Sequence, residues 1–314
     1  MNFARSIRHR VLGSSDLPRQ VTVGMHDPQS EIAVWLDGMS VPHDVTDRHV
    51  MACASPLTLG VVVDPEWETS GAVAGLSLRF QERRADGCVL GRIRLRGLGV
   101  AASVGAGLRL FGVDRTDNYC LPRLQLFAHY LDLGYRRRRF NNNPEVQLSA
   151  REAHAMIVFL ICPRPAVLVT AVHNGGGNVF PMNLMGPVGD SHFAFALNST
   201  RLAAPLVERA GRLAISNIPV EQAGLARQLG RNHLKESVDM NDLPFITRAT
   251  PTFGFPVPDF AVRVRELEIE AKQRIGSHTF FIARTIHDEH GAPLPEFFSI
   301  HGIYQAWRLK HARA

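Results

Sequence analysis

A short polar segment in the second half of the chain has the residue types that bind phosphate. Asn198, Ser199, Thr200 and Arg201 supply an amide, two hydroxyls and a guanidinium at four consecutive positions. The segment follows the apolar run 193–197 and precedes a stretch with helical periodicity, which predicts a strand-to-helix turn. The N–H groups of a helix N-terminus attract the same anion as the guanidinium. The alternative is that Ser199 or Thr200 only caps the helix.

Other patterns that could carry chemistry are weaker. The segment His287-Asp288-Glu289-His290 has metal-ligand residue types but precedes Gly291, so we expect a solvated turn and no metal site. Cys53, Cys88, Cys120 and Cys162 are far apart, without the spacing of a zinc site. The sequence has no Gly-x-Ser-x-Gly stretch or HExxH motif that would indicate hydrolysis.

Charge and hydropathy exclude several classes of protein. The net charge of +6 is divided equally between residues 1–148 and 149–314, so we expect no nucleic-acid partner. The dense cluster Arg136–Arg139 is expected to be a solvated loop, with a phosphate or nucleic-acid contact as the alternative. No apolar run approaches the roughly 18 residues of a membrane span, and no secretory signal is evident. We therefore expect a cytoplasmic protein without a membrane contact.

The order of predicted elements indicates a mainly β protein with peripheral helices. We expect a flexible N-terminus over 1–20, a β-rich domain over 21–140, a linker at Asn141–Pro144 and a second domain over 149–314. The second domain opens with a helix signal, since Ser149 and Glu152 have the spacing of a capping box. The strands do not alternate regularly with helices, which favours a closed antiparallel barrel over a parallel sheet. Strands are predicted at 21–23, 32–36, 57–63, 76–80, 89–96, 166–172, 193–197, 213–218, 261–264, 267–271 and 279–283. Helices are predicted at 121–133, 150–157, 200–210 and 222–229.

Residues 149–310 resemble the flavin reductase-like family, whose fold is the FMN-binding split β-barrel. Four stretches carry this resemblance in the family's order. They are Pro163–Thr170, Asn178–Val188, Phe193–Arg201 with Ala214–Ile218 after it, and Leu267–Ala271 leading into Gly276–Ala283.

The resemblance implies a function. It predicts a flavin-binding oxidoreductase that reduces FMN or FAD with NADH or NADPH. It also implies a homodimer that binds the flavin at the dimer edge, and a monooxygenase that receives the reduced flavin. Two alternatives remain open, namely a non-catalytic flavin-binding or sensor protein and a flavoenzyme that acts on its own organic substrate.

The resemblance also assigns candidate site residues. The turn Asn198–Arg201 would hold the flavin phosphate, and the segment 178–188 would lie along the isoalloxazine ring. The ring contacts are expected from Asn178, Pro181, Met182, Asn183 and Leu184, where the family usually has small Ser or Thr residues. For Met182 and Leu184, a place in the barrel core is the alternative.

His278 is the candidate catalytic residue. Many flavin reductases have Gly-Asp-His at this point, a motif linked to nicotinamide binding, whereas this chain has Gly276-Ser277-His278. A histidine here could position the nicotinamide amide or stabilise negative charge on the reduced ring. The alternative is a turn histidine without a role.

The first half of the chain is predicted to be a degenerate second split barrel. Leu57–Val63 resembles the strand before the phosphate turn, and residues 86–93 resemble 276–283 in hydropathy. Asp64-Pro65-Glu66 would place acids where a phosphate should lie. One chain would then contain a pseudo-dimer of two barrels. An unrelated β-rich domain is the alternative.

Overall fold

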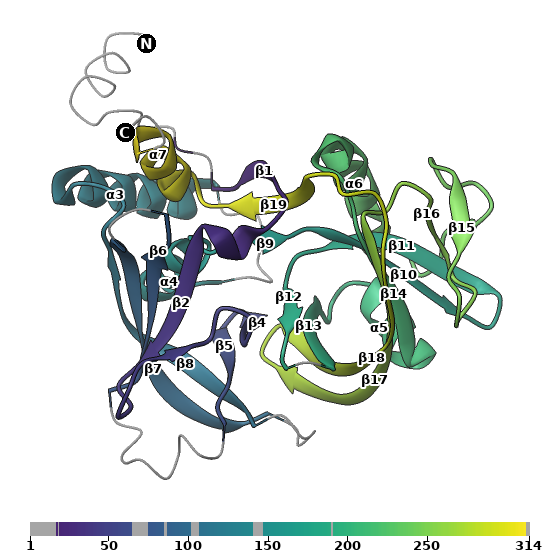
Figure 1. Ribbon diagram of the computed structural model, residues 1–314, viewed down its shortest axis with the longest axis horizontal. Coiled ribbons are helices and arrows are strands. Elements are labelled where there is room, and N and C mark those ends of the chain that lie inside the picture. The colour runs from purple at the N-terminus through teal and green to yellow at the C-terminus, as the bar shows by residue number, and fades with distance from the viewer. Residues whose placement is uncertain are drawn as a thin grey trace, which may run out of the picture.

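The structure is a computed structural model of the chain. It describes residues 17, 19–64, 75–84, 87–101, 107–140, 147–189 and 191–311. Two curled, seven-stranded antiparallel sheets form most of this part, with helices around them (Figure 1). The predicted linker Asn141–Pro144 and most of the predicted flexible N-terminus lie outside the described residues.

The first sheet is built from consecutive strands in the N-terminal half. In chain order they are β2 (Ile32–Asp37), β3 (His43–Asp44), β4 (His49–Ala54), β5 (Leu57–Val62), β6 (Ser77–Glu82), β7 (Val89–Val100) and β8 (Leu108–Asn118). In β7, the buried Ile93 and Leu95 alternate with the exposed Arg92, Arg94 and Arg96. This alternation gives β7 one face in the core and one in water, as the sequence predicts.

The second sheet follows in the C-terminal half. Its strands are β10 (Val167–His173), β11 (Gly176–Met182), β12 (Met185–Pro187), β13 (His192–Asn198), β14 (Arg212–Asn217), β17 (Arg263–Ile275) and β18 (His278–His290). A small hairpin, β15 (Thr247–Ala249) with β16 (Pro256–Pro258), is inserted before β17. The helices α5 (Ala203–Ala210) and α6 (Ala223–Leu229) and the 3-10 turns η2 (Val220–Gln222) and η3 (Gly230–Leu234) complete this half.

The two sheets have the same strand order. The first reads β3-β2-β6-β7-β8-β5-β4 and the second β11-β10-β14-β17-β18-β13-β12. Counted along the chain within each sheet, both orders are 2-1-5-6-7-4-3. The predicted second barrel is therefore confirmed in its topology, and the first half is not an unrelated β-rich domain.

The shared order also tests the two predicted correspondences. Leu57–Val63 contains β5, the fourth strand of its sheet, and β13 before the phosphate turn is likewise the fourth, so this prediction is confirmed. The match of 86–93 with 276–283 is wrong, because β7 is a sixth strand and β18 a seventh. Any half-buried strand shows the same alternation, so hydropathy alone could not identify the equivalent strand.

The outer faces of the two barrels pack against each other, with β4 lying on β12, β13 and β18. The buried contact, which we call the junction cluster, joins side chains of both halves. They are Val50, Ala52, Val62, Ala101, Leu108 and Leu110 from the first half and Val188, Ala194, Ala196, Phe280 and Ile282 from the second.

The chain also crosses between the halves. Helix α4 (Ala150–Phe159) packs on β7 and β8 of the first barrel. Strand β19 (Glu296–Ile300) pairs with β1 (Val21–Met25) and β9 (Arg164–Pro165), and helix α7 (Gly302–His311) then lies against the first half (Figure 1). Tyr304 of α7 is buried and donates a hydrogen bond to Glu31 at 3.1 Å. Both ends of the predicted second domain thus contribute to the core of the first.

Two predicted loops are regular structure instead. Helix α3 (Arg123–Phe140) runs through Arg136–Arg139, where cations interact favourably with the helix C-terminus. Arg136 also pairs with Asp132 at 2.6 Å. His287–His290 forms the end of β18, and Asp288 pairs with Arg263 at 2.6 Å. Among the described residues, no helix is long and apolar enough to cross a membrane.

The predicted capping box at α4 is present and also connects the two halves. Glu152 accepts hydrogen bonds from the backbone N–H of Ser149 at 2.7 Å and of Leu57, in β5, at 2.9 Å. The Ser149 hydroxyl accepts in turn from the backbone of Glu152.

We expect Glu152→Ala to lower the free energy of unfolding by about 2–3 kcal/mol, because it leaves two backbone donors without their acceptor. Glu152→Gln should lose less, since its single oxygen still accepts. Urea unfolding of both variants measures the difference. Equal stability of wild type and Glu152→Ala would contradict this assignment.

Candidate functional site

A pocket of about 300 Å³ lies between the end of β11, the end of β13, the start of β18 and η3. It brings together seven of the ten predicted site residues. These are Pro181, Met182, Asn183, Leu184, Asn198, Arg201 and His278. Asn178, Ser199 and Thr200 are not among its lining residues.

The predicted phosphate turn is held together by its own side chains. The Asn198 Oδ1 accepts from the backbone N–H of Thr200 at 3.0 Å and from its hydroxyl at 2.8 Å. The Ser199 hydroxyl lies 3.0 Å from the hydroxyl of Thr279 on β18. Both predicted hydroxyl ligands are therefore engaged within the protein, and Arg201 is the cationic side chain of the turn that lines the pocket.

The alternative role for this turn, capping of the helix, is wrong. Helix α5 begins at Ala203, and its N-cap position is Leu202, which makes no side-chain capping bond. Ser199 and Thr200 thus lie three and two residues ahead of the observed N-cap. The backbone N–H of Ser199 instead donates to the carbonyl of Ser277 at 3.0 Å. That bond ties the phosphate turn to the β17–β18 turn.

The middle of the pocket has an apolar wall, formed by Met182, Leu184, Ala196 and Leu197. Met182 belongs at the same time to the core of the second barrel, and Leu184 packs against the junction cluster. Met182 and Leu184 are therefore both packed in the hydrophobic core and part of the pocket wall. An apolar wall beside a cation and amide groups is the composition of a small-molecule site.

His278 is directly opposite Asn198 in the pairing of β13 with β18. Its side chain is buried, with Nδ1 2.8 Å from the Ser277 hydroxyl and 3.6 Å from the Sγ of Cys53. Burial, with a smaller contribution from Arg274, lowers the pKa of His278 to about 4. The imidazole is therefore neutral at pH 7 and can donate or accept a hydrogen bond.

Asn178 has a structural position. It is fully buried, and its Nδ2 donates to the carbonyls of Asn232 at 3.0 Å and Lys235 at 2.9 Å. Asn232 returns a bond from its own Nδ2 to the carbonyl of Val179 at 2.7 Å. These bonds attach η3 to β11, so Asn178 shapes the pocket by holding its wall.

His233 lines the pocket but carries no sequence signal, because it lies in an irregular turn without a motif. Its Nε2 donates to the carbonyl of Pro181 at 2.8 Å, and its ring lies 4.8 Å from that of Phe180. Burial, and then the nearby Arg201, lower its pKa. His233 is thus a neutral donor that fixes the backbone of the predicted ring-binding segment.

The first barrel supports the pocket from behind. Cys53 lies near the end of β4, and Ser55 directly follows the strand. The carbonyl of Ser55 accepts a hydrogen bond from the backbone N–H of Ser277 at 2.9 Å. Gly276 has a φ of +51°, and a Cβ there would lie 2.4 Å from the Ser55 oxygen. Glycine is therefore required at this position both for the turn and for the approach of the other barrel. Among the described residues, no group of His, Cys, Asp and Glu could hold a metal ion.

The family comparison agrees with the sequence resemblance. Residues 159–299 match the model of the flavin reductase like domain. No curated protein gives a significant match.

Several solved structures are similar to about half of the chain. The NADH:FAD oxidoreductase of Streptomyces globisporus C-1027 is 19% identical, with 48% of this chain and 88% of that chain covered and a TM-score of 0.42. The FMN-binding protein from Thermus thermophilus is 23% identical, with coverages of 41% and 73% and a TM-score of 0.36. The styrene monooxygenase flavin reductase from Pseudomonas putida S12 is 19% identical, with coverages of 47% and 92% and a TM-score of 0.37.

The buried histidines predict a loss of stability in acid. Burial lowers the pKa of His278 to about 4 and of His301 to about 3, from about 6.5 in the unfolded chain. Between pH 6.5 and pH 5 the unfolded chain binds protons that the folded chain does not. Each histidine should then reduce the free energy of unfolding by up to about 2 kcal/mol over that interval.

Urea unfolding at pH 7 and pH 5 measures this loss, and His278→Asn should make it smaller. An identical pH dependence in wild type and His278→Asn would show that His278 titrates normally in the folded protein.

Proposed function

Residues 159–299 match the flavin reductase like domain, and from this match we propose that the chain binds FMN or FAD and reduces it with NADH or NADPH. The flavin would occupy the pocket between β11, β13 and β18. The observation that carries the proposal is the convergence, in this one pocket, of a cationic turn, an apolar wall and a neutral histidine from three separate stretches of sequence.

The pocket residues fit the parts of a flavin. Arg201 and the Asn198 turn would hold the phosphate by charge-assisted hydrogen bonds. The segment Pro181–Leu184 would lie along the ring, with Met182 and Leu184 excluding water from it. A bound flavin supplies the two-electron chemistry by accepting a hydride from the reduced nicotinamide, so the protein needs only to bind and orient.

His278 would orient the reactants. With its pKa lowered to about 4 it stays neutral through the physiological range. A neutral imidazole can donate or accept a hydrogen bond at a carboxamide or a ring carbonyl, and the Ser277 hydroxyl at 2.8 Å restricts its orientation. This arrangement supports positioning of the nicotinamide over charge stabilisation of the reduced flavin.

The first barrel would take the place of a second protomer, without a flavin of its own. Its fourth strand, β5, leads into Asp64, where β13 of the second barrel leads into the phosphate turn. Asp64 pairs with Arg48 at 2.7 Å, and a carboxylate there would repel a phosphate. The neighbouring Pro65 and Glu66 lie outside the described residues.

Other parts of the proposal follow from the resemblance alone. They are a homodimer of the whole chain, transfer of the reduced flavin to a monooxygenase, and a cytoplasmic location. Light scattering of the purified protein measures its molecular mass in solution. A mass of two chains is expected, and a mass of one chain would reject the homodimer.

A second candidate function is flavin binding without turnover. The observation that favours it is Ser277, which replaces the acid of the family's Gly-Asp-His motif and makes a hydrogen bond with His278. The two functions differ in one assay, in which NADH or NADPH is mixed with FMN or FAD and absorbance is followed at 340 nm. Catalytic loss of absorbance supports the reductase. Flavin binding without nucleotide oxidation, in all four combinations, would reject it in favour of a binding protein.

Arg201→Ala should weaken FMN binding by roughly 10- to 100-fold, because it removes a charge-assisted contact to the phosphate. Riboflavin, which lacks the phosphate, should bind wild type and variant alike. Fluorescence quenching of each flavin gives the affinities. Arg209→Ala, at an exposed ion pair on α5, is the matched control. Equal loss of FMN and riboflavin binding would place the phosphate elsewhere.

A further inference from the structure

A second pocket, of about 500 Å³, lies where the two barrels and the returning C-terminal strand meet. It shares no lining residue with the flavin pocket. The β11–β12 segment borders both, with Pro181–Leu184 on the flavin pocket and Met185–Pro187 on this one. We call it the junction pocket. Its volume is within the range of sites for small organic molecules.

Arg164, on β9, lines the junction pocket and is 7% exposed. Its partners are all uncharged. The guanidinium contacts the Nε2 of His49, lies 3.4 Å from the His49 carbonyl, and sits 4.0 Å above the Phe159 ring. Its Nε has no hydrogen-bond partner, and no carboxylate of the described chain lies within ion-pair distance of it.

His49 cannot balance this charge. Its Nδ1 donates to the carbonyl of Val45 at 2.8 Å, so its Nε2 faces Arg164 as an acceptor. Burial, and then Arg164 itself, lower the pKa of His49 well below its usual value. Cys162, also in the lining, is buried, and burial raises the pKa of its thiol. Arg164 is thus a buried cation among neutral groups.

The second barrel's wall of the pocket has its own internal pairs. Asp288 accepts from Arg263 at 2.6 Å and from Arg265 at 3.2 Å. The Glu296 carboxylate accepts from the Asn217 amide at 2.5 Å. Asp288 is thus balanced by two arginines, whereas Glu296 is hydrogen-bonded to a neutral amide, and neither carboxylate pairs with Arg164.

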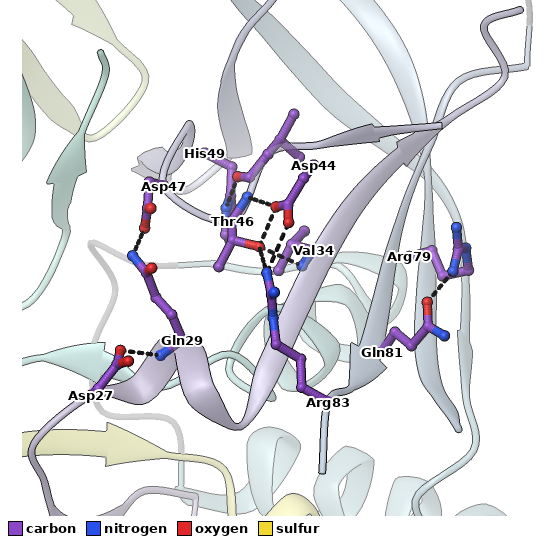
Figure 2. Close-up of polar contacts among 11 residues, drawn as sticks. Asp27, Gln29, Val34, Asp44, Thr46, Asp47, His49, Arg79, Gln81 and Arg83 are labelled. Atoms are coloured by element: carbon purple, nitrogen blue, oxygen red, sulfur yellow. Dashed lines mark hydrogen bonds and ion pairs between the residues drawn. The ribbon is translucent and has the colours of Figure 1, made fainter. Parts of the chain in front are cut away.

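The first barrel's wall carries two acids, Asp27 and Asp47, which accept hydrogen bonds from the neutral Gln29. Figure 2 shows Gln29 between them, with its side-chain amide donating to Asp47 and its backbone N–H donating to Asp27 at 2.9 Å. Asp47 lies on the loop between β3 and β4. The corresponding loop of the second barrel, between β11 and β12, borders the flavin pocket.

We propose that the junction pocket binds a small organic acid, whose carboxylate pairs with Arg164 and whose apolar part lies against Met185, Phe193 and Phe298. A buried guanidinium without a counterion is costly, and a carboxylate matches its paired N–H donors. The lining supplies apolar surface beside the cation, which selects an organic anion over a bare inorganic ion. The site is independent of flavin binding.

The test is calorimetric titration of the full chain with acetate, benzoate and succinate, and with benzamide as the neutral counterpart of benzoate. We expect at least one carboxylate to bind one per chain. If it is benzoate, benzamide should bind at least about tenfold more weakly. Arg164→Met should lower carboxylate affinity by at least about tenfold and leave FMN binding unchanged. Arg201→Ala, in the flavin pocket, should leave carboxylate binding unchanged.

Absence of binding by all three carboxylates would overturn the proposal, as would equal affinity in wild type and Arg164→Met. Displacement of bound FMN by the carboxylate would assign it to the flavin pocket instead, and would also overturn the proposal. If Arg164→Met does not fold, wild-type crystals soaked with 4-iodobenzoate decide the matter. An iodine anomalous peak in the junction pocket, with the carboxylate at Arg164, is expected, and a peak absent from it contradicts the site.

Discussion

The contact between the outer faces of the two barrels is the constraint on which the rest of the structure depends. The faces can approach closely because the second barrel presents Ala194 and Ala196 where larger side chains would separate the sheets. Leu184 packs on the same cluster, and Leu184 and Ala196 also form part of the flavin pocket wall. The shape of the pocket is therefore set partly by a barrel that contributes none of its lining residues.

The same contact between the barrels fixes the positions of the phosphate turn and the β17–β18 turn. Because Gly276 and Ser277 lie against Ser55, the β17–β18 turn has one position relative to the phosphate turn, which it holds through the Ser199 backbone. His278 is buried by this arrangement and is neutral as a result. The neutral state of His278, on which its proposed role depends, thus originates in the packing of the first half of the chain against the second.

Much of the fold could be predicted from the sequence, because strong local signals agree with it. Alternation identified β7, the capping box identified the start of α4, and apolar runs identified β5, β10, β13 and β14. The strands β8 and β11 were not predicted. The sequence-based prediction was wrong where tertiary contacts determine the local structure. Arg136–Arg139 continues a helix because α3 packs on the core, and the polar run 287–290 continues a strand because it pairs with β17.

The candidate site shows the same division. Consecutive residues such as Pro181–Leu184 could be placed together because one segment carries them. The hydroxyls of Ser199 and Thr200 were expected to face a ligand, but each found a partner within the protein. The resemblance predicts a ring contact for Asn178 because it places the whole segment 178–188 along the flavin, whereas the burial of Asn178 against η3 is a long-range contact. Arg164 and His233 had no motif at all, since their significance depends on burial and on partners from distant strands.

The central claim is that one chain with two barrels of the same topology has a single flavin site, which lies in the second barrel. A crystal structure of the protein grown with FMN tests it most directly. We predict one FMN per chain, with its phosphate at Arg201, its ring along Pro181–Leu184, and no flavin at the end of β5. A second flavin beside Asp64, or a flavin bound away from the β11–β13–β18 pocket, would contradict the account.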